Sequence, residues 1–420
     1  MAYLAPDPFR QAIRSGLALS YSVSASFNGS PVVGATDLRP TGGSITDTTK
    51  PGVRRLLNLS LAPADGLFDR LAPIGTELTV TCHVTYTDRF TVDIPMGVFD
   101  VDSEKVSEGG GEISLTAPDR WAQIQRARFL QPKASTPGLL VTEQISLLLR
   151  EVIGLGAAVT ITATSTQSVG ALTWEKDRDK AIMELAESIG AWVYFDRSGV
   201  ATIADVPTIG DTADWLIDYA GVLTELDRER SRTNTRNVVI VESSASDGEK
   251  FATQIVWDND PTSPTYAGID PFSPTNTPGP FGVVPYYYDT PILQSDLSAR
   301  TAGLTILARV TGLASQVSLG SVPNPAIDAF DVLDVMPPHG WTTTVEYVGG
   351  DGFGTMPFGA GPFGGGSGGG VPVVRRSPLG AFLERHVVDT VTHPLVQPVG
   401  GNGGNPQHID GRSTRTDDFS

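Results

Sequence analysis

The residue types that most often carry catalysis or bind metals are few in this chain, and they are scattered. Its single cysteine, Cys82, lies in the alternating stretch TVTCHVTY, which predicts a small apolar strand residue. One cysteine excludes an internal disulfide and a cysteine-based zinc site. None of the five histidines belongs to an HxxxH or HxH pair: His83, His339, His386, His393 and His408. His386 and His393 are too far apart on an extended strand to share one metal.

Motifs for nucleophiles and phosphates are also missing. The sequence has no GxSxG elbow and no GxxxxGK[ST] loop, and no GxGxxG stretch joins a strand to a helix. The glycine-rich stretch GFGTMPFGAGPFGGG is not followed by a helix start, so it does not predict a phosphate loop. We therefore predict no catalytic, cofactor-binding or metal-binding residue and no enzyme activity.

Carboxylates leave one catalytic alternative open, a pair of the glycosidase type. The candidates qualify by residue type alone: Asp100, Asp102, Asp328, Asp331 and Asp334. The last three are spaced three apart, which on a strand sends successive side chains to opposite faces. We expect these carboxylates to be solvated or to lie at the edges of turns.

A basic run at residues 226–237 is the clearest candidate for an interaction surface. It contains Arg228, Arg230, Arg232 and Arg236, whose alternate spacing places them on one face of an extended strand. Such a face can contact phosphates or pair with acidic residues of a neighbouring subunit. The chain carries a net charge of −17, so we favour the pairing between subunits over contact with nucleic acid.

The composition indicates many short strands, because glycine (46) and proline (31) are abundant and charged residues make up only 18%. Stretches in which apolar and polar residues alternate fill residues 16–117 and predict strands there. Short and longer helices are predicted near 119–129 and 138–154. A helix with Asp177 as N-cap ends at Gly190 and leads into a hairpin that turns at DRSG.

From about residue 215, the sequence pattern again predicts strands. A Pro-, Thr- and Tyr-rich insertion covers residues 258–291, a third helix follows at 295–312, and further strands close the chain. A glycine-rich insertion at 349–370 spaces Phe353, Phe358 and Phe363 five residues apart. It is predicted to be either a disordered surface loop or a docking loop. The start is unlike a signal peptide and no stretch is long and apolar enough for a membrane span, so we expect synthesis in a cytoplasm without membrane insertion.

Two stretches carry a resemblance to a known family. DKAIMELAESIGAWVYFDRSGVATIAD resembles a segment of phage tail baseplate-hub proteins, in which a helix leads into a strand, a D..G turn and a second strand. DNDPTSP…PFGVVPYYYDTP, SARTAGLTILARVTG and VSLGSVPNPAIDAFDVLDV are similar to minor tail proteins of actinobacterial siphophages, as is the closing RHVVDTVTHPLVQP with GRSTRTDD. The resemblance spans nearly the whole chain and rests on patterns, not on catalytic signatures.

The resemblance implies a mainly β fold in which two tail-tube-like β-barrel domains flank a mixed α/β domain. The implied divisions are 1–117 and 216–397 for the barrels, with insertions at 258–291 and 349–370, 118–215 for the α/β domain, and 398–420 for an extended C-terminal tail. Three such chains would supply six barrel-like domains and so match a sixfold tube.

The function implied is that of a structural virion protein at the phage tail tip, made in the host cytoplasm. It would form a trimeric hub ring that joins the tail tube or a distal tail protein to tip fibres or central tip proteins. Tape-measure protein and DNA would pass through an acidic or neutral lumen without specific binding. If the insertion at 349–370 is a docking loop, three copies of Phe353, Phe358 and Phe363 would bury together and close that lumen weakly; a plain hub does not need this insertion. Two alternatives stay open: a tail-tip cell-wall hydrolase, and a distal-tail or carbohydrate-binding adaptor that uses the aromatic cluster VPYYYD at 284–289.

Overall fold

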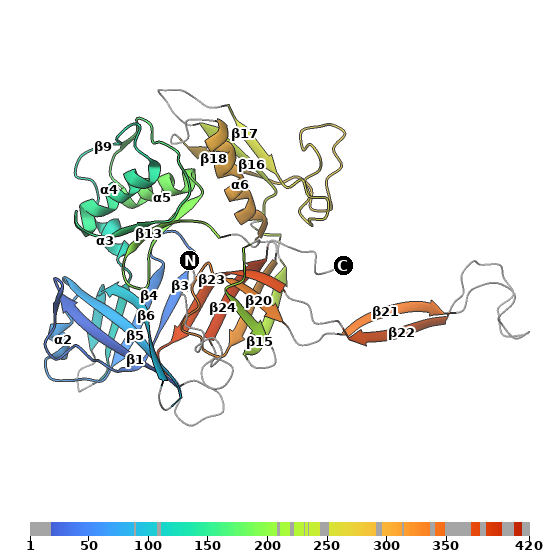
Figure 1. Ribbon diagram of the computed structural model, residues 1–420. Coiled ribbons are helices and arrows are strands. Elements are labelled where there is room, and N and C mark those ends of the chain that lie inside the picture. The colour runs from blue at the N-terminus through green and yellow to red at the C-terminus, as the bar shows by residue number, and fades with distance from the viewer. Residues whose placement is uncertain are drawn as a thin grey trace, which may run out of the picture.

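The computed structural model is mainly β, with three longer helices gathered beside the sheets (Figure 1). It describes residues 18–87, 90–106, 111–207, 211–218, 222–230, 232–233, 235–243, 252–290, 296–312, 315–336, 341–348, 371–378, 384–396 and 407–413. Among these residues, no helix combines the length and apolar character that crossing a membrane requires. The mainly β fold class predicted from the sequence is confirmed.

The first half begins with a four-stranded antiparallel sheet. Its order is β2 (Ser30–Pro31), β1 (Ala18–Phe27), β5 (Thr76–Thr87) and β6 (Phe90–Asp100). Alternate side chains of β1 and β5 face inward, so Tyr21, Val23, Val80 and Cys82 are buried as the period-two pattern predicted.

A ten-stranded sheet joins the two halves of the chain. Its main path consists of β15 (Leu223–Arg230), β19 (Ser315–Ser321), β24 (Gln407–Ser413), β23 (Glu384–Pro394), β3 (Pro40–Thr48), β4 (Arg55–Leu61), β8 (Ile113–Pro118) and β7 (Ser103–Val106). Off this path, β20 (Val332–Met336) pairs with β23, and β14 (Trp215–Asp218) pairs with β20. The two halves meet where β23 pairs antiparallel with β3, from Thr390 opposite Thr48 to Pro394 opposite Ser44.

Two isolated bridges join the two sheets of the first half along their edges. One bridge joins Val23 to Leu38, and the other joins Phe99 to Asp119. A single core runs between the sheets and continues under the strands of the second half, where Val317, Leu333 and Val391 belong to it. The strand β8 ends at Pro118, one residue past the predicted division at 117, and both the sheet and its core continue into the second half.

The α/β region packs around its own core. It contains α3 (Trp121–Arg126), α4 (Val141–Ile153), α5 (Arg178–Ser188) and five short strands: β9 (Lys133–Ala134), β10 (Val159–Ile161), β11 (Thr173–Trp174), β12 (Ala191–Phe195) and β13 (Ala201–Asp205). The predicted apolar stripe of α5 is buried, with Ile182 and Leu185 both 0% exposed. Gly190 follows the helix with a φ of 66°, as expected of a left-handed helix end.

The β12–β13 hairpin turns where the sequence predicted. The Asp196 carboxylate accepts the backbone N–H groups of Ser198 and Val200. Gly199 has a φ of 72°, and a Cβ there would lie 2.9 Å from the side chain of Val98 in β6. The turn therefore needs glycine both for its backbone conformation and for its close approach to the first sheet.

The second half contains a separate small α/β unit that the sequence analysis did not anticipate. In it, β16 (Val238–Ser243) lies between β17 (Gln254–Trp257) and β18 (Pro285–Thr290), and α6 (Asp296–Gly312) covers this sheet. Val239, Val241, Val256 and Ile306 form its core. The Pro- and Thr-rich segment between β17 and β18 extends from this unit as a looped arm (Figure 1).

The predicted C-terminal tail differs from the structure in one stretch. Residues 407–413 form β24, which pairs with β19 on one side and β23 on the other. Ile409 is fully buried, so this strand is an integral part of the ten-stranded sheet. The insertion at 349–370 lies outside the described residues. It connects β21 (Trp341–Val348) to β22 (Val371–Pro378), an antiparallel ladder that extends away from the other sheets (Figure 1).

We predict that Ile409→Ala lowers the free energy of unfolding by about 2–5 kcal/mol, because it removes a fully buried side chain from a strand paired on both sides. Urea denaturation measures this change. The matched control is Ile161→Ala at a 43% exposed strand position, with an expected cost below about 1 kcal/mol. Equal costs at the two positions would mean that β24 is not part of the folding core.

Candidate functional site: a buried charge cluster at the junction of three regions

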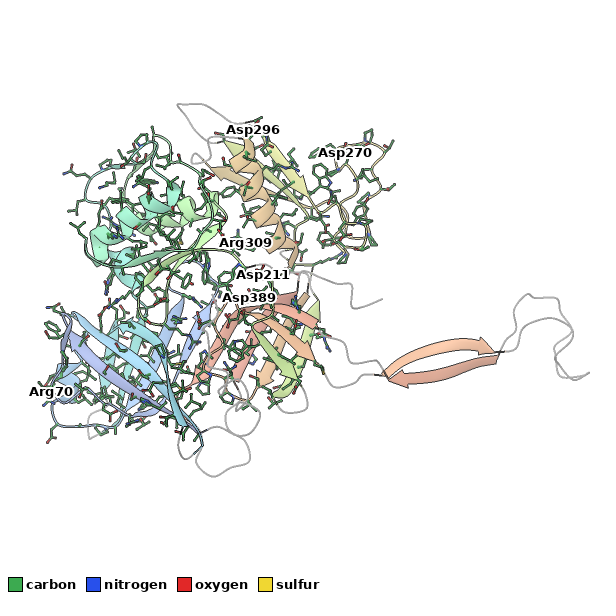
Figure 2. The ribbon with its side chains drawn as sticks, viewed as in Figure 1. Arg70, Asp211, Asp270, Asp296, Arg309 and Asp389 are labelled. Atoms are coloured by element: carbon green, nitrogen blue, oxygen red, sulfur yellow. The ribbon has the colours of Figure 1, made fainter. Side chains whose placement is uncertain are left out.

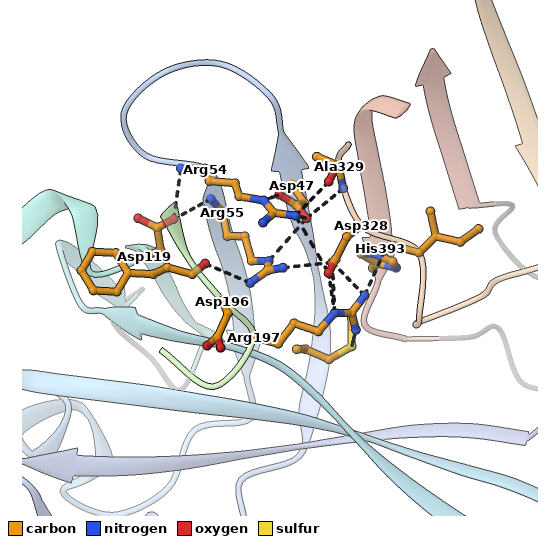
Figure 3. Close-up of polar contacts among 12 residues, drawn as sticks. Asp47, Arg54, Arg55, Asp119, Asp196, Arg197, Asp328, Ala329 and His393 are labelled. Carbon is orange, nitrogen blue, oxygen red and sulfur yellow. Dashed lines mark hydrogen bonds and ion pairs between the residues drawn. The ribbon is translucent and has the colours of Figure 1, made fainter. Parts of the chain in front are cut away.

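Three arginines and two aspartates meet in the interior where the two halves of the sheet contact the α/β region. Asp47 comes from β3, Arg54 directly precedes β4, and Arg55 is the first residue of β4. Arg197 lies in the turn of the β12–β13 hairpin, and Asp328 lies in the connection between β19 and β20. Figure 3 shows their side chains converging from these elements. We call these five residues the junction cluster.

Arg54 is held mainly by Asp47. Its Nε and Nη2 donate to the two carboxylate oxygens of Asp47 at 2.6 and 2.9 Å, a bidentate pair (Figure 3). Nη2 also donates to the carbonyl of Ala329 at 3.1 Å, and the Ala329 N–H donates back to Asp47 at 3.1 Å. These contacts fix the β19–β20 connection against β3.

The carboxylate of Asp328 is shared by two other arginines. Nε of Arg197 lies 3.0 and 2.9 Å from its two oxygens, and Nη2 of Arg55 lies 2.9 Å from Oδ1. Arg197 also donates to the carbonyls of Pro325 and Ile327, at 2.5 and 3.0 Å. The hairpin of the α/β region is thereby bound to a loop of the second half.

The cluster is closed to solvent, with exposures of 1% for Asp47, 4% for Arg54, 2% for Arg55, 5% for Arg197 and 7% for Asp328. Buried charges are tolerated only when they are paired and hydrogen-bonded. The geometry meets this condition. What the cluster can do is hold three regions of the chain in one arrangement.

Burial and the charges of the cluster shift the pKa values of the titratable groups in and around it. Although burial acts the other way, the arginines at Asp328 hold the pKa of its carboxyl well below the usual range. Burial, together with the charge of Asp328, raises the pKa of Asp331 well above its usual range. Burial lowers the pKa of His393 to about 3, and its Nε2 lies 3.1 Å from the Ile327 carbonyl oxygen. With a pKa of about 3, His393 is neutral at neutral pH and adds no charge to the cluster.

Asp119 connects the cluster to the start of α3. Its carboxylate accepts the backbone N–H groups of Arg54, Arg55 and Trp121 at 2.9–3.0 Å. Burial raises the pKa of Asp119 to about 6, since the three N–H groups offset only part of the desolvation.

A pocket of about 760 Å³ lies next to the cluster, between α5, β12, α6 and the ten-stranded sheet. Its walls include the aromatic rings of Trp192, Tyr194 and Phe330; Trp192 stacks on Tyr194 with ring centroids 3.9 Å apart. The guanidinium of Arg54 lies over both rings, 4.9 Å from the Trp192 centroid and 4.7 Å from that of Tyr194. The junction cluster thus forms part of the pocket wall.

The structure separates the carboxylates that the sequence offered as candidates. Asp328 and Asp331 lie at the two ends of a turn before β20, as one form of the prediction has it, but they are only 7% and 2% exposed, so they are buried and not solvated. Asp100 is also buried and pairs with Arg126, whereas Asp102 is exposed. Asp334 pairs with Arg385 at 2.7 Å.

The basic run is only partly a strand face, because β15 ends at Arg230. Arg228 makes a bidentate pair with Glu384 of the same chain, at 3.1 and 2.6 Å. Arg232 is exposed, and Arg236 donates to the carbonyl of Thr235. The role of this face between subunits stays a prediction. Phe353, Phe358 and Phe363 lie outside the described residues.

Sequence reasoning missed Asp47, Arg54, Arg55 and Arg197 altogether. The only local signal is the placement of two arginines at the head of a strand that is otherwise apolar at every second residue, RRLLNLSL. Arg197 reads as an ordinary turn residue in DRSG. Their partner Asp328 is 131 positions from Arg197 and 273 from Arg55, and no spacing rule connects such distant residues. Within the described residues, no group of three or more His, Cys, Asp or Glu side chains is arranged to hold a metal.

Comparison with known proteins identifies the fold. No protein-family model and no curated protein sequence matches the chain. Among solved structures, a tail protein from Neisseria meningitidis MC58 is similar, with a TM-score of 0.55 and 13% identity over 94% of this chain and 97% of that one. The 43 kDa tail protein of prophage MuSo2 from Shewanella oneidensis has a TM-score of 0.51 and 11% identity over 94% and 98% of the two chains. The expected resemblance to tail proteins is confirmed at the level of fold.

We predict that Asp328→Ala lowers the free energy of unfolding by about 3–5 kcal/mol, because it removes the carboxylate that Arg55 and Arg197 share and leaves the buried positive charge of the cluster poorly compensated. Chemical denaturation measures the loss. Asp102→Ala, at an exposed carboxylate in the first half, serves as the control and changes the stability by about 0.5 kcal/mol or less. Similar effects for the two variants would contradict the assigned role of the cluster.

We predict a pH-dependent difference between the wild type and Asp119→Asn. The folded-state pKa of Asp119 is raised to about 6 from 3.8, so the folded chain binds the proton more tightly than the unfolded chain. Wild-type stability therefore gains relative to the variant as the pH falls from about 6 to about 4, by up to about 1.4 kcal/mol per pH unit. Urea titrations at pH 7, 6, 5 and 4 measure it. A constant difference across this range would contradict the raised pKa.

Proposed function

We propose that this chain is a structural, non-enzymatic component of a phage tail, and that three copies form a hub ring at the tail tip. The observation that carries the proposal is the shared fold with two tail proteins along 94% of the chain. A fold match of this length includes the sheets and the α/β region together, so the whole architecture, and not one domain of it, supports the proposal.

The junction cluster suits a component that must keep its shape. A hub transmits force between a tube and a tip, so its β halves and its α/β region have to keep one relative position. Arg197 and Asp328 connect these regions through buried, hydrogen-bonded charges, and separating them would leave those charges unpaired. The energetic penalty for opening the junction is therefore high.

Open sheet edges support assembly with further copies. On the described path of the ten-stranded sheet, β15 and β7 are the two ends. Unpaired strand edges favour association unless they are covered. In the proposed ring, neighbouring copies cover them, and the Arg228 and Arg230 side of β15 then lies near an adjacent subunit. Each chain contributes its two β halves, 1–117 and 216–397, to a pseudo-sixfold arrangement that a sixfold tube can continue.

The proposed partners follow from this position. The tail tube or a distal tail protein adjoins one face of the ring, and tip fibres or central tip proteins adjoin the other. Tape-measure protein and DNA pass through the lumen without specific binding, in keeping with the net charge of −17. The insertion with Phe353, Phe358 and Phe363 is proposed to dock at the ring axis or on a tip partner.

One observation bears on the carbohydrate-binding alternative. The three tyrosines of VPYYYD lie in β18, where Tyr286 and Tyr288 pack against the core of the small α/β unit and Tyr287 is 61% exposed. Alternation along the strand thus turns successive rings to opposite sides. One exposed ring is not the flat aromatic platform that this alternative needs, so the hub is the function we favour.

We predict that the purified full-length chain forms a particle of three times 44.4 kDa with threefold symmetry. Light scattering coupled to size exclusion measures the mass, and electron microscopy measures the symmetry. Trimers fit the proposal because each chain brings two β halves to the ring. A chain that stays monomeric at micromolar concentration, or a ring of six copies, would contradict it.

A further inference from the structure

The arm between β17 and β18 contains one turn motif twice. Residues 260–266 read DPTSPTY and residues 270–276 read DPFSPTN. Both copies make the same hydrogen bonds: the Ser263 and Ser273 N–H groups donate to the carbonyls of Asp260 and Asp270, each at 3.0 Å. In both, a serine hydroxyl lies beside a threonine hydroxyl, at 3.0 and 2.9 Å. The first turn is therefore an internal reference for the second.

The two turns differ at the side chains that they expose. The first turn presents the polar residues Asn259 and Thr262 to solvent. The second presents Ile269, 81% exposed, and Phe272, 59% exposed, at the equivalent positions. The same backbone thus carries a polar surface in one copy and an apolar surface in the other. Since neither apolar side chain is needed to build the turn, their exposure indicates a contact surface.

Charge adds a second property to this apolar turn. Between residues 252 and 290 the chain has four aspartates and no lysine or arginine. Asp270 is exposed, and its carboxylate accepts the N–H of Phe272 at 3.0 Å, which fixes an acid directly beside the ring. A surface that receives this turn has to be apolar inside and basic at its edge.

The pocket beside the junction cluster has this character. Trp192, Tyr194 and Phe330 supply aromatic walls, and Leu304 of α6 lies at its margin with 49% exposure. The exposed Lys50 belongs to its rim. Figure 2 shows Asp270 out on the arm, well apart from Arg309 on the wall of the pocket, so the turn does not occupy the pocket of its own chain.

We propose that the second turn of one copy inserts Ile269 and Phe272 into this pocket of the next copy, with Asp270 facing Lys50. The contact joins two different surfaces of the same chain, so it is head-to-tail and generates a closed ring when the rotation permits. Each copy then gives one turn and receives one, which leaves no apolar turn and no aromatic pocket uncovered. The inference rests on the proposed ring and specifies one of its subunit contacts.

Disulfide trapping between separately prepared chains tests the contact. One preparation carries Phe272→Cys and the other carries Leu304→Cys; the native Cys82 is fully buried and stays unreactive. Mixed and mildly oxidised, they are expected to give a covalent dimer, because inserted residues come within disulfide reach. Neither preparation should cross-link alone. A trimer without this cross-link, or cross-linking of Phe272→Cys with itself, overturns the inference but not the ring. A monomer overturns both.

Surface variants measure the strength of the contact. Ile269→Asn with Phe272→Thr gives the second turn the side chains of the first, and is expected to weaken association about tenfold or more. Asn259→Ala with Thr262→Ala is the matched control in the first turn, with no expected change. Lys50→Glu should weaken association most at low salt. Equal effects of the two turn variants would overturn the inference.

Discussion

The relative position of the two β halves and the α/β region depends on the burial of one carboxylate, that of Asp328. Its two oxygens meet the guanidinium groups of Arg197 and Arg55, and the loop that carries it is bound to Asp47 through Ala329. A buried charge without partners costs several kcal/mol, so the cluster exists either with all its members in place or not at all. The hairpin turn, the start of β4 and the β19–β20 connection consequently occupy one relative position. The cluster also helps to fix the shape of the pocket, because Arg54 belongs to the cluster and lies over the ring of Trp192, which lines the pocket.

Local physics made much of the fold predictable from the sequence. Period-two alternation located β1 and β5, and helical spacing with a glycine stop located α5. The resemblance to tail proteins indicated the architecture that the fold comparison then supported. These features depend on neighbours within a few residues, where propensity, spacing and turn chemistry act directly.

The junction cluster and β24 could not be predicted from local sequence patterns. Whether Arg197 faces solvent or a buried carboxylate depends on where residue 328 lies in space, and the sequence DRSG reads the same in either case. Residues 407–413 are polar enough to pass for a tail. They become a core strand because β19 and β23 leave a gap of one strand between them. Tertiary pairing overrides a weak local preference at both places.

The ladder between β3 and β23 has a consequence for how the molecule is made. Thr48, near the start of the chain, pairs with Thr390 near its far end, and the carboxylate of Asp47 accepts a hydrogen bond from the N–H of Ala329, far along the chain. During synthesis, the sheet begun at residue 40 therefore has an open edge until residues 384–394 have left the ribosome. Pairings so distant in sequence are slow to form, because the intervening chain must first be brought to order. Correct folding is thus a late event, and a fragment that stops before β23 leaves the edge of β3 without its partner strand instead of forming a smaller complete sheet.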